Sequence, residues 1–364
     1  MCVTAINIGL PTLGGLDKVP ATDLKQTAKD FTSDQEVRWC PGCGDYAVLA
    51  AVRGFLPELG IRRENMVFVS GIGCSSRFPY YLDTYGMHSI HGRAPTIATG
   101  LAITRPDLSV WVVTGDGDAL SIGGNHLIHT LRRNVNLKIL LFNNRIYGLT
   151  KGQYSPTSET GKVTKSTPTG SVDHPLNPIS LALGAEATFV ARALDSDRAQ
   201  LTSVLRAAAA HRGTALVEIF QDCPIFNDGA FDLIRRGSAD AAQRLIPLTH
   251  GSPIRFGSGG EFAVVRKAFG LGVARTSDVA ESEIVIHNET DHTLAFALSR
   301  LSTQDLEHVV TGVVRRVDRT CYDDAVRDET DTARTHHKGD LQSLLSGRDT
   351  WTVADPADVQ GRRK

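Results

Sequence analysis

An α/β fold with a doubly wound, mostly parallel sheet is predicted by the alternation of buried strands with amphipathic helices along the chain. Short runs rich in Val, Ile, Leu and Phe have the length and continuous apolar character of strands buried on both faces. Stretches with apolar residues at helical spacing lie between these runs. The predicted strands are Met66–Ser70, Val110–Thr114, Leu137–Phe142 and Ala215–Phe220, and the predicted helices are Tyr46–Leu56, Ser121–Arg133 and Asp197–His211. Because ligands of such sheets bind at the carboxyl ends of the strands, we expect the functional residues there.

Composition indicates an ordinary globular protein without a charged global field. A chain of 364 residues with 41% hydrophobic and 22% charged residues can bury one large core. Its formal net charge of -1 gives it no general attraction for nucleic acid or anionic lipid. Residues 1–15 lack the basic start and the long apolar run of a secretion signal, and no later stretch approaches the roughly 20 apolar residues of a membrane span. We therefore expect a cytoplasmic protein that binds neither nucleic acid nor membrane.

Four segments are expected along the chain. Residues 1–30 show no sustained period and predict a loosely ordered N-terminal arm, whereas residues 31–253 carry the strand and helix pattern of the main domain. Residues 254–330 contain short apolar runs and predict a small C-terminal extension that packs on the main domain or on a partner chain. The polar residues 331–364 predict a flexible tail that contains a short helix at Leu341–Leu345.

A long loop is predicted within the main domain. The segment Lys151–Pro178 is rich in Thr, Ser, Gly and Pro and has no apolar period. Loops of this length inside compact domains are often functional, so we expect it to cover the active site.

Oxygen-bearing side chains follow two neighbouring strands of the predicted sheet. Gly115-Asp116-Gly117-Asp118 follows one strand, and Asn143-Asn144 follows the next, with one helix and one strand between them. A carboxylate and a carboxamide can therefore converge on one cation at the same sheet edge. The glycines let the backbone approach a phosphate, and the next helix offers free N–H groups at its start. A lone Gly-Asp-Gly is usually only a turn, but the paired spacing favours a magnesium and diphosphate site, with Asn143 expected to hold its loop.

The pair Cys40 and Cys43, in Trp-Cys-Pro-Gly-Cys-Gly, has several interpretations. A thioredoxin-like dithiol would follow an apolar strand, but polar residues of a predicted loop precede this pair. A zinc knuckle would need a second close pair of Cys or His, and the candidate His126 and His129 lie on a predicted helix beside the diphosphate loop.

Two further cysteines, Cys74 and Cys223, lie in loops at predicted strand ends. Four thiolates that reach one point from three loops suit a [4Fe–4S] cluster. The remaining cysteines, Cys2 and Cys321, are expected to be ordinary thiols.

Five motifs together resemble the β subunits of 2-oxoacid:ferredoxin oxidoreductases, most of all those of two-subunit 2-oxoglutarate enzymes. They are Cys-Pro-Gly-Cys-Gly, Gly-Ile-Gly-Cys-Ser, His-Gly-Arg, Gly-Asp-Gly-Asp and Asn-Asn-x-x-Tyr-Gly-x-Thr, and the resemblance covers about residues 31–330. It implies a thiamine-diphosphate-binding fold with Mg²⁺ and a [4Fe–4S] cluster. It also implies CoA-dependent oxidative decarboxylation of a 2-oxoacid, with electrons passed to ferredoxin and with 2-oxoglutarate expected over pyruvate. The aminopyrimidine half of thiamine needs a second domain, for which this chain has no room, so an α subunit is expected as partner.

The resemblance also implies residue roles. The magnesium ligands would be Asp116 and Asn144 by side chain and Ile146 by its carbonyl oxygen, and the cluster ligands would be Cys40, Cys43, Cys74 and Cys223. The residues lining the cofactor would be Ile72, Gly73, Cys74, Ser75, His91, Gly117, Asp118, Gly148 and Leu149. His91 and Lys151 are the candidate catalytic residues. We place His91 near the thiamine, and we weigh Lys151 equally as a contact for substrate carboxylate or CoA phosphates and as a solvated surface lysine.

Two other functions remain open from the sequence. A non-oxidative thiamine-diphosphate decarboxylase or carboligase would share the diphosphate site, but it would have no use for four gathered cysteines. A zinc-stabilised binding protein, in which Gly-Asp-Gly is only a turn, would contain zinc and no iron. The colour and the metal content of the purified protein separate these three hypotheses.

Overall fold

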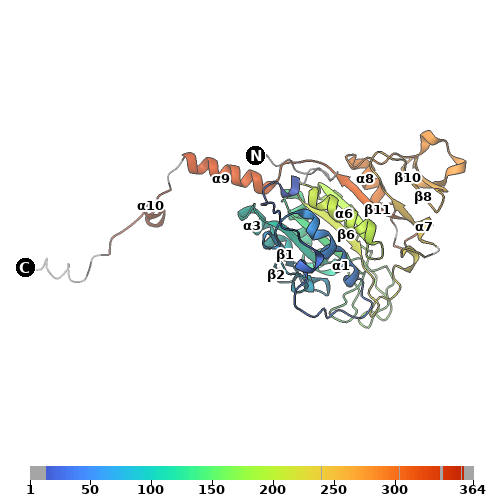
Figure 1. Ribbon diagram of the computed structural model, residues 1–364, viewed down its shortest axis with the longest axis horizontal. Helices are drawn as coiled ribbons and strands as arrows, with labels where there is room; N and C mark the ends of the chain where they lie inside the picture. Colours follow the sequence, from blue (N-terminus) through green and yellow to red (C-terminus); the bar gives the residue numbers. More distant parts are fainter. Residues whose placement is uncertain (1–13, 239, 303, 337–338, 354, 356–364) are drawn as a thin grey trace, which may run out of the picture. The chain divides into compact units, whose positions relative to one another are not determined.

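The computed structural model describes residues 14–238, 240–302, 304–336, 339–353 and 355 (Figure 1). Its internal contacts divide the chain after Asp323 into a large first unit and a small second unit. Residues 1–13 of the expected arm, with Cys2, lie outside the described residues. No helix among the described residues is long and apolar enough to cross a membrane.

The first unit is built on an eight-stranded sheet (Figure 1). In spatial order its strands are β2 (Tyr85–His88), β1 (Met66–Ser70), β3 (Ser109–Gly115), β4 (Lys138–Asn143), β6 (Ala215–Phe220), β5 (Phe189–Leu194), β11 (Val309–Arg316) and β7 (Leu245–Pro247). Strand β11 runs antiparallel to β5, and all the other neighbours are parallel. The predicted α/β fold with a mostly parallel sheet is therefore confirmed.

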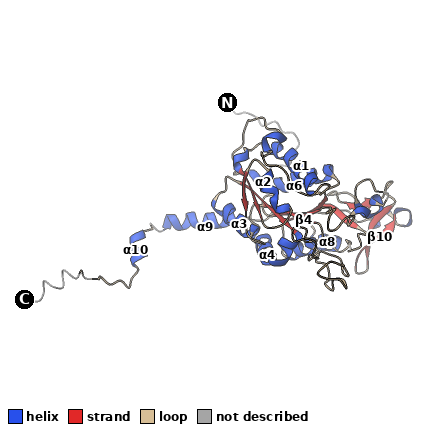
Figure 2. Cartoon of the chain, turned by 90° about the horizontal axis from the view of Figure 1, so that it is seen from below, coloured by secondary structure: helices blue, strands red, loops and turns tan. Residues whose placement is uncertain are grey.

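Helices cover both faces of this sheet (Figure 2). One face packs against α1 (Asp45–Phe55) and α6 (Arg198–Ala210), and the other packs against α3 (Ala94–Thr104), α4 (Gly124–Arg133), α5 (Pro178–Gly184) and α8 (His292–Ser299). Successive residues of a strand point to opposite faces, so Trp111 joins the core of the first face and Val112 joins that of the second. Both faces are buried, as the unbroken apolar runs predicted.

A small antiparallel sheet forms the expected C-terminal extension of the first unit. Its strands are β8 (Arg255–Phe256), β9 (Phe262–Lys267) and β10 (Gly270–Arg275), in the order β10-β9-β8. It lies near α8, while β2 forms the opposite end of the large sheet (Figure 1). The extension thus leaves the carboxyl ends of β1, β3 and β4 uncovered.

Two predicted segments differ from the structure. The described part of the arm, residues 14–30, packs on its own domain, because Leu16 and Val19 are buried in the core around α1 and α6. The polar segment near residue 330 is helical: α9 (Tyr322–His336) runs through the expected start of the tail. Pairs of opposite charge one turn apart stabilise this helix, among them Arg334 and Asp331 at 3.1 Å.

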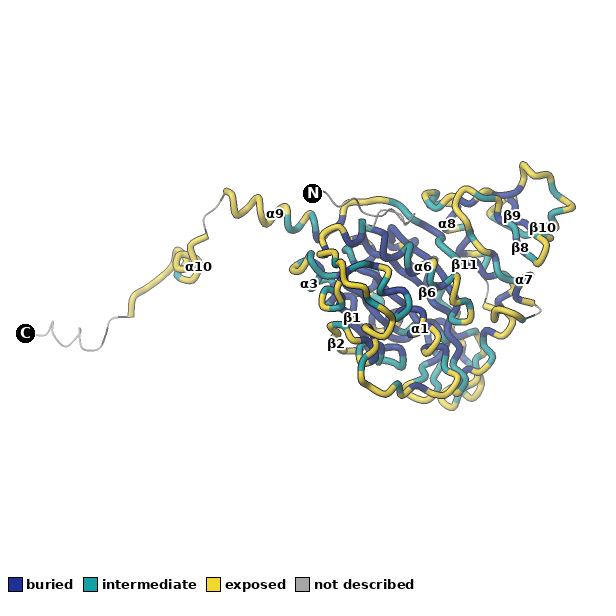
Figure 3. The backbone as a smooth tube through the Cα atoms, viewed as in Figure 1, coloured by how far each residue is buried: buried dark blue, intermediate teal, exposed yellow. Residues whose placement is uncertain are grey.

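The short helix expected in the tail is present as α10 (Leu341–Ser346), and its residues are almost all exposed (Figure 3). The remaining short α-helices are α2 (Phe78–Tyr81) and α7 (Ala241–Arg244). A π-helical turn over Asp118–Ile122 follows β3 and leads into α4. This turn places the Gly-Asp-Gly-Asp motif at the carboxyl edge of the sheet.

Candidate active site

A pocket at the carboxyl ends of β1, β3 and β4 gathers every residue predicted to bind the cofactor or magnesium. Its lining contains Ile72, Gly73, Cys74, Ser75, His91, Asp116, Gly117, Asp118, Asn144, Ile146, Gly148 and Leu149. The further lining residues Gly115, Phe142, Tyr147 and Thr150 were not predicted. We call this cavity the diphosphate pocket.

Asp116 is buried at the base of the diphosphate pocket. Its Oδ2 atom accepts hydrogen bonds of 2.6 Å from the hydroxyls of Ser155 and Thr157. Burial raises the pKa of Asp116 to about 6, and the two hydroxyls partly oppose this rise by stabilising the carboxylate. A carboxylate held in this way is a suitable magnesium ligand near neutral pH. Both hydroxyls come from the predicted long loop, but their roles were not predicted.

Asn144 and Ile146 occupy the tight turn after β4. The Asn144 Oδ1 atom accepts a 3.1 Å hydrogen bond from the backbone N–H of Ile146, while its Nδ2 donates to Gln221 at 3.0 Å. These two hydrogen bonds fix the orientation of the Asn144 carboxamide, whose oxygen faces the backbone of the turn. Arg145, between them, has a positive φ of 57°, an uncommon backbone conformation for a non-glycine residue. The oxygen donors of this turn and of Asp116 fit the hard oxygen site that Mg²⁺ requires.

Gly117 is required by the close approach of an aromatic ring. A Cβ atom at this position would lie 2.2 Å from the ring of Tyr147, whose hydroxyl donates to the Gly117 carbonyl oxygen at 3.0 Å. Any larger residue would displace Tyr147 or the loop. The glycine therefore keeps the backbone next to the space for the diphosphate.

Asp118 joins three loops rather than simply lining the pocket. Its carboxylate accepts hydrogen bonds from the N–H groups of Ile72 and Gly92, at 3.1 and 2.7 Å, and from the Thr114 hydroxyl at 2.6 Å. It also pairs with Nδ1 of His91. Because its oxygens are committed to the protein's own donors, Asp118 positions the pocket walls. The same contact leaves Nε2 of the half-exposed His91 for a bound molecule.

Cys40, Cys43, Cys74 and Cys223 line a second pocket of about 250 Å³, which we call the thiol pocket. All four are free thiols, and Cys40 is the exposed member. The thiol pocket shares Cys74, Asn144, Gly148 and Leu149 with the diphosphate pocket. The two cavities are therefore neighbours with a common wall.

The wall shared by the two pockets is thin at Gly148, which has no side chain. A Cβ atom there would lie 3.4 Å from Cys74 Sγ and 3.8 Å from Cys223 Sγ. Lys151 lines the thiol pocket and is absent from the lining of the diphosphate pocket. Lys151 is therefore placed at the thiols and not at the proposed diphosphate site.

The thiols lie in an environment that disfavours free thiolates. Burial raises the pKa of Cys74 to about 12, and the nearby Asp45 carboxyl adds to the rise. Burial also raises the pKa values of Cys43 and Cys223. Iron would have to displace these protons on binding. Among the described residues, no three His, Cys, Asp or Glu side chains form a group that could hold a single metal ion.

Comparison with known proteins gives consistent matches. Residues 71–219 match the family model of the thiamine pyrophosphate enzyme C-terminal TPP binding domain. The chain is 69% identical over 348 residues to "2-oxoglutarate oxidoreductase subunit KorB" of Mycobacterium tuberculosis, covering 94% of this chain and 93% of that protein. It is 42% identical over 198 residues to "2-oxoglutarate synthase subunit KorB" of Methanocaldococcus jannaschii, covering 54% of this chain and 73% of the relative.

A solved structure matches the whole fold. It is the 2-oxoglutarate:ferredoxin oxidoreductase of Magnetococcus marinus with 2-oxoglutarate, coenzyme A and succinyl-CoA bound. The TM-score is 0.72 at 33% sequence identity, and the match covers 91% of this chain and 99% of the other. The similarity therefore extends well beyond the thiamine-binding motif.

Proposed function

The chain belongs to the β subunits of the 2-oxoacid:ferredoxin oxidoreductases, and we propose that it acts with an α subunit to convert 2-oxoglutarate and CoA to succinyl-CoA and CO₂. Ferredoxin would take up the two electrons released. Relatives named for 2-oxoglutarate and a solved homologue that binds 2-oxoglutarate and succinyl-CoA support this substrate. The four thiols of the thiol pocket form no disulfide, which is compatible with a reducing compartment, so we assign the enzyme to the cytoplasm.

The observation that carries the proposal is the common wall between the diphosphate pocket and the thiol pocket. Asp116 and Asn144, with the carbonyl oxygen of Ile146, would hold Mg²⁺ on the diphosphate of thiamine. Bound thiamine diphosphate supplies an electron sink for the loss of CO₂. Gly148, by carrying no side chain, would let that cofactor lie close to the neighbouring thiols.

Cys40, Cys43, Cys74 and Cys223 would hold a [4Fe–4S] cluster in the thiol pocket. Such a cluster carries electrons singly, which suits transfer to ferredoxin. Gln221 donates a hydrogen bond to Cys43 Sγ at 3.4 Å, a contact that would stabilise a negative thiolate. Because Cys40 is exposed, a cluster bound to it would be accessible to ferredoxin from this side.

His91 and Lys151 complete the proposal. Asp118 orients His91 through Nδ1, so that Nε2 can accept a hydrogen bond in the neutral ring, or donate one to the bound 2-oxoacid in the protonated ring. Lys151 lies beside Arg38 and Arg77 in the lining of the thiol pocket. Three cations at one cavity suit the phosphates of CoA better than an apolar ligand.

The test of substrate is a comparison of kcat/KM for 2-oxoglutarate and for pyruvate in the reconstituted αβ enzyme with CoA and ferredoxin. The second carboxylate of 2-oxoglutarate can add a charge-assisted hydrogen bond worth about 1.5–3 kcal/mol. That contribution corresponds to a preference of roughly ten- to a hundredfold for 2-oxoglutarate. A higher value for pyruvate would overturn the substrate assignment, and turnover without ferredoxin reduction would favour a non-oxidative enzyme.

A further inference from the structure

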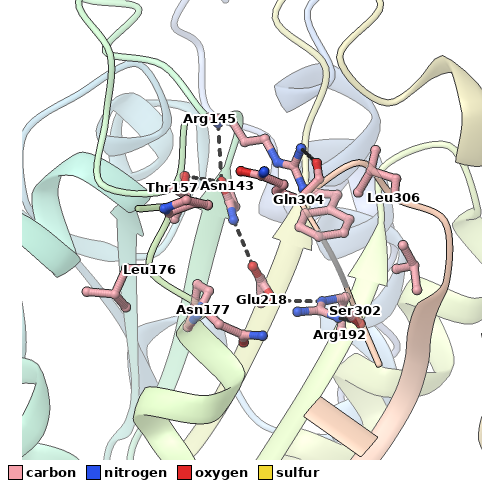
Figure 4. A pocket seen from close by; sticks show the side chains of 14 residues that line it. Asn143, Arg145, Thr157, Leu176, Asn177, Arg192, Glu218, Ser302, Gln304 and Leu306 are labelled. Carbon is pink, nitrogen blue, oxygen red and sulfur yellow. Dashed lines mark hydrogen bonds and ion pairs between the residues drawn. The ribbon is translucent and has the colours of Figure 1, made fainter. Parts of the chain in front are cut away.

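A chain of buried side chains leads from Asp116 across the neighbouring strands β4, β6 and β5. Figure 4 shows four of its members, Thr157, Asn143, Glu218 and Arg192. The single hydroxyl hydrogen of Thr157 is shared between two acceptors, Asp116 Oδ2 at 2.6 Å and Asn143 Oδ1 at 2.8 Å from the hydroxyl oxygen. Asn143 Nδ2 donates to Glu218 Oε1 at 2.7 Å, and Arg192 Nε donates to Glu218 Oε2 at 2.7 Å. None of these five residues is more than 4% exposed.

We propose that Thr157, Asn143, Glu218 and Arg192 form a positioning relay that holds the Asp116 carboxylate in place for the cation. The relay rests on the proposed function, because it assumes that Asp116 binds Mg²⁺. It adds four residues that do not touch the cofactor. Of these, only Asn143 was singled out from the sequence, as a residue that holds its loop.

The direction of each hydrogen bond follows from the chemistry of Glu218. An ionised carboxylate only accepts hydrogen bonds, so Asn143 must turn its NH₂ group toward Glu218. The Asn143 carbonyl oxygen is thereby directed toward the Thr157 hydroxyl and the backbone N–H of Arg145. Glu218 therefore determines the orientation of Asn143, and Asn143 holds Thr157 beside Asp116.

Arg192 anchors the other end of the relay. Its Nη1 atom donates to the Ser302 hydroxyl at 2.7 Å, in the segment before β11, so the guanidinium is fixed between β5, β6 and that segment (Figure 4). A buried ion pair costs desolvation and is weak evidence for stability alone. We explain this buried ion pair by its role in orienting Asn143. Hydrogen bonds are stronger in a low-dielectric interior, so they fix the orientation of their partners more firmly.

The relay also connects the long loop to the metal site. Ser155 and Thr157, both from this loop, donate to the same oxygen of Asp116. Ser158, also in the loop, donates to the carbonyl oxygen of Arg145 at 2.6 Å. The loop thus supports the turn that carries Asn144 as well as the Asp116 carboxylate.

The test uses two substitutions of Thr157 in the αβ complex, with Mg²⁺ affinity measured by calorimetric titration in the presence of thiamine diphosphate. Thr157→Val keeps the shape but removes the hydroxyl, and we expect the affinity to fall about ten- to a hundredfold, as when a group that supports a metal ligand is lost. Thr157→Ser keeps the hydroxyl and should recover the affinity to within about threefold of the unmodified complex, since the bond is retained.

Thr188→Val is the matched control. Thr188 is fully buried, and its hydroxyl bonds Asn134 Oδ1 at 2.5 Å and His211 Nε2 at 2.8 Å, outside the relay. This variant should lower Tm as a buried hydroxyl is lost, while Mg²⁺ affinity stays at the value of the unmodified complex. If Thr157→Val behaves like Thr188→Val, or if Thr157→Ser is as weak as Thr157→Val, the relay is overturned.

Two further variants separate the relay from the cation site itself. Asp116→Ala should abolish Mg²⁺ binding; retained binding would refute the proposed cation site, whatever Thr157 does. Glu218→Gln introduces an NH₂ group that can face the NH₂ group of Asn143 and turn the Asn143 carboxamide away from its present orientation. We therefore expect a weaker Mg²⁺ affinity, although Asp116 and Thr157 are both retained. A Glu218→Gln protein that folds and binds Mg²⁺ with the original affinity would contradict the relay.

Discussion

Cys223 is far from Cys40 and Cys43 in the chain, yet all three thiols line one pocket. The Gly44 backbone N–H donates to the carbonyl oxygen of Asp222 at 3.1 Å, which joins the loop of the cysteine pair to that of Cys223. The Trp39 side chain donates from Nε1 to the carbonyl oxygen of Cys74 at 2.7 Å and adds the Cys74 loop. These hydrogen bonds hold the loops that carry the thiols next to one another. For the proposed cluster, such a scaffold would lower the entropic cost of binding iron.

The first prediction compares two cysteines in the αβ complex. Cys223→Ser removes a proposed cluster ligand, and we expect iron content and ferredoxin reduction to fall to near background. Cys321→Ser is the control, because Cys321 is buried and does not line the thiol pocket. Iron and sulfide analysis after anaerobic purification gives the answer. Loss of iron in Cys321→Ser with full iron in Cys223→Ser would show that the ligand set is wrong.

The candidate site could be predicted where its residues lie in short motifs, and could not where it depends on tertiary contacts. Asp116 and Asn144 follow strands that the apolar pattern identifies, so their convergence follows from sheet topology. Ser155 and Thr157 lie in a segment without a period, so nothing in the sequence indicates that they reach Asp116. Glu218 is a single charged residue within the apolar run of a buried strand, and its partner is visible only in the structure.

At the level of elements, the turn just before α1 carries the cysteine pair against the neighbouring loops. Gly44, the residue before this helix, lies so close to Asp195 that an added Cβ would be 1.9 Å from Asp195 Oδ2 and 3.0 Å from the Asp222 nitrogen. Its backbone is an ordinary helical one, with φ −60°. A glycine is needed at this position because a side chain would not fit, and not because the backbone adopts an unusual conformation.

The second prediction follows from this close approach. Gly44→Ala should move α1 away from the Asp222 loop, lower the free energy of unfolding by about 1–3 kcal/mol and reduce iron content. Gly100→Ala in α3 is the control, because its added Cβ would meet no atom within 4 Å. That change should stabilise the helix by about 0.5–1 kcal/mol and leave iron content as it was. Denaturant unfolding and iron analysis of both variants check the prediction, and equal effects of the two changes would refute it.

The strands that could be predicted are those buried on both faces. β1 and β6 match their predicted bounds, because every position in them is apolar or packed. The edge strand β2 has four exposed residues and no apolar pattern, so only its pairing with β1 reveals it. In β5, the buried Arg192 interrupts the apolar run, and the ion pair that permits its burial is not visible in the sequence.

For the whole molecule, the first unit is built on one large sheet with a small extension, and its exposed apolar residues include Leu149, which lines the diphosphate pocket, and Ile90, which precedes the lining residue His91. Exposed apolar side chains beside a cofactor pocket fit a surface that a partner covers.

The third prediction is that the isolated β subunit is inactive. Adding the α subunit to it should restore CoA-dependent oxidation of 2-oxoglutarate, as measured by ferredoxin reduction. Full turnover by the isolated chain would contradict this prediction.

The central claim, that one chain holds both the site of decarboxylation and the first electron acceptor, is tested most directly by adding 2-oxoglutarate and CoA to the anaerobic αβ enzyme without ferredoxin. The account predicts a brown protein whose cluster absorbance is bleached by substrate and which gives the electron paramagnetic resonance signal of a reduced cluster. In Cys223→Ser both signals should be lost, while thiamine diphosphate remains bound. A protein that contains zinc and no iron, or a cluster that 2-oxoglutarate and CoA leave oxidised, would contradict it.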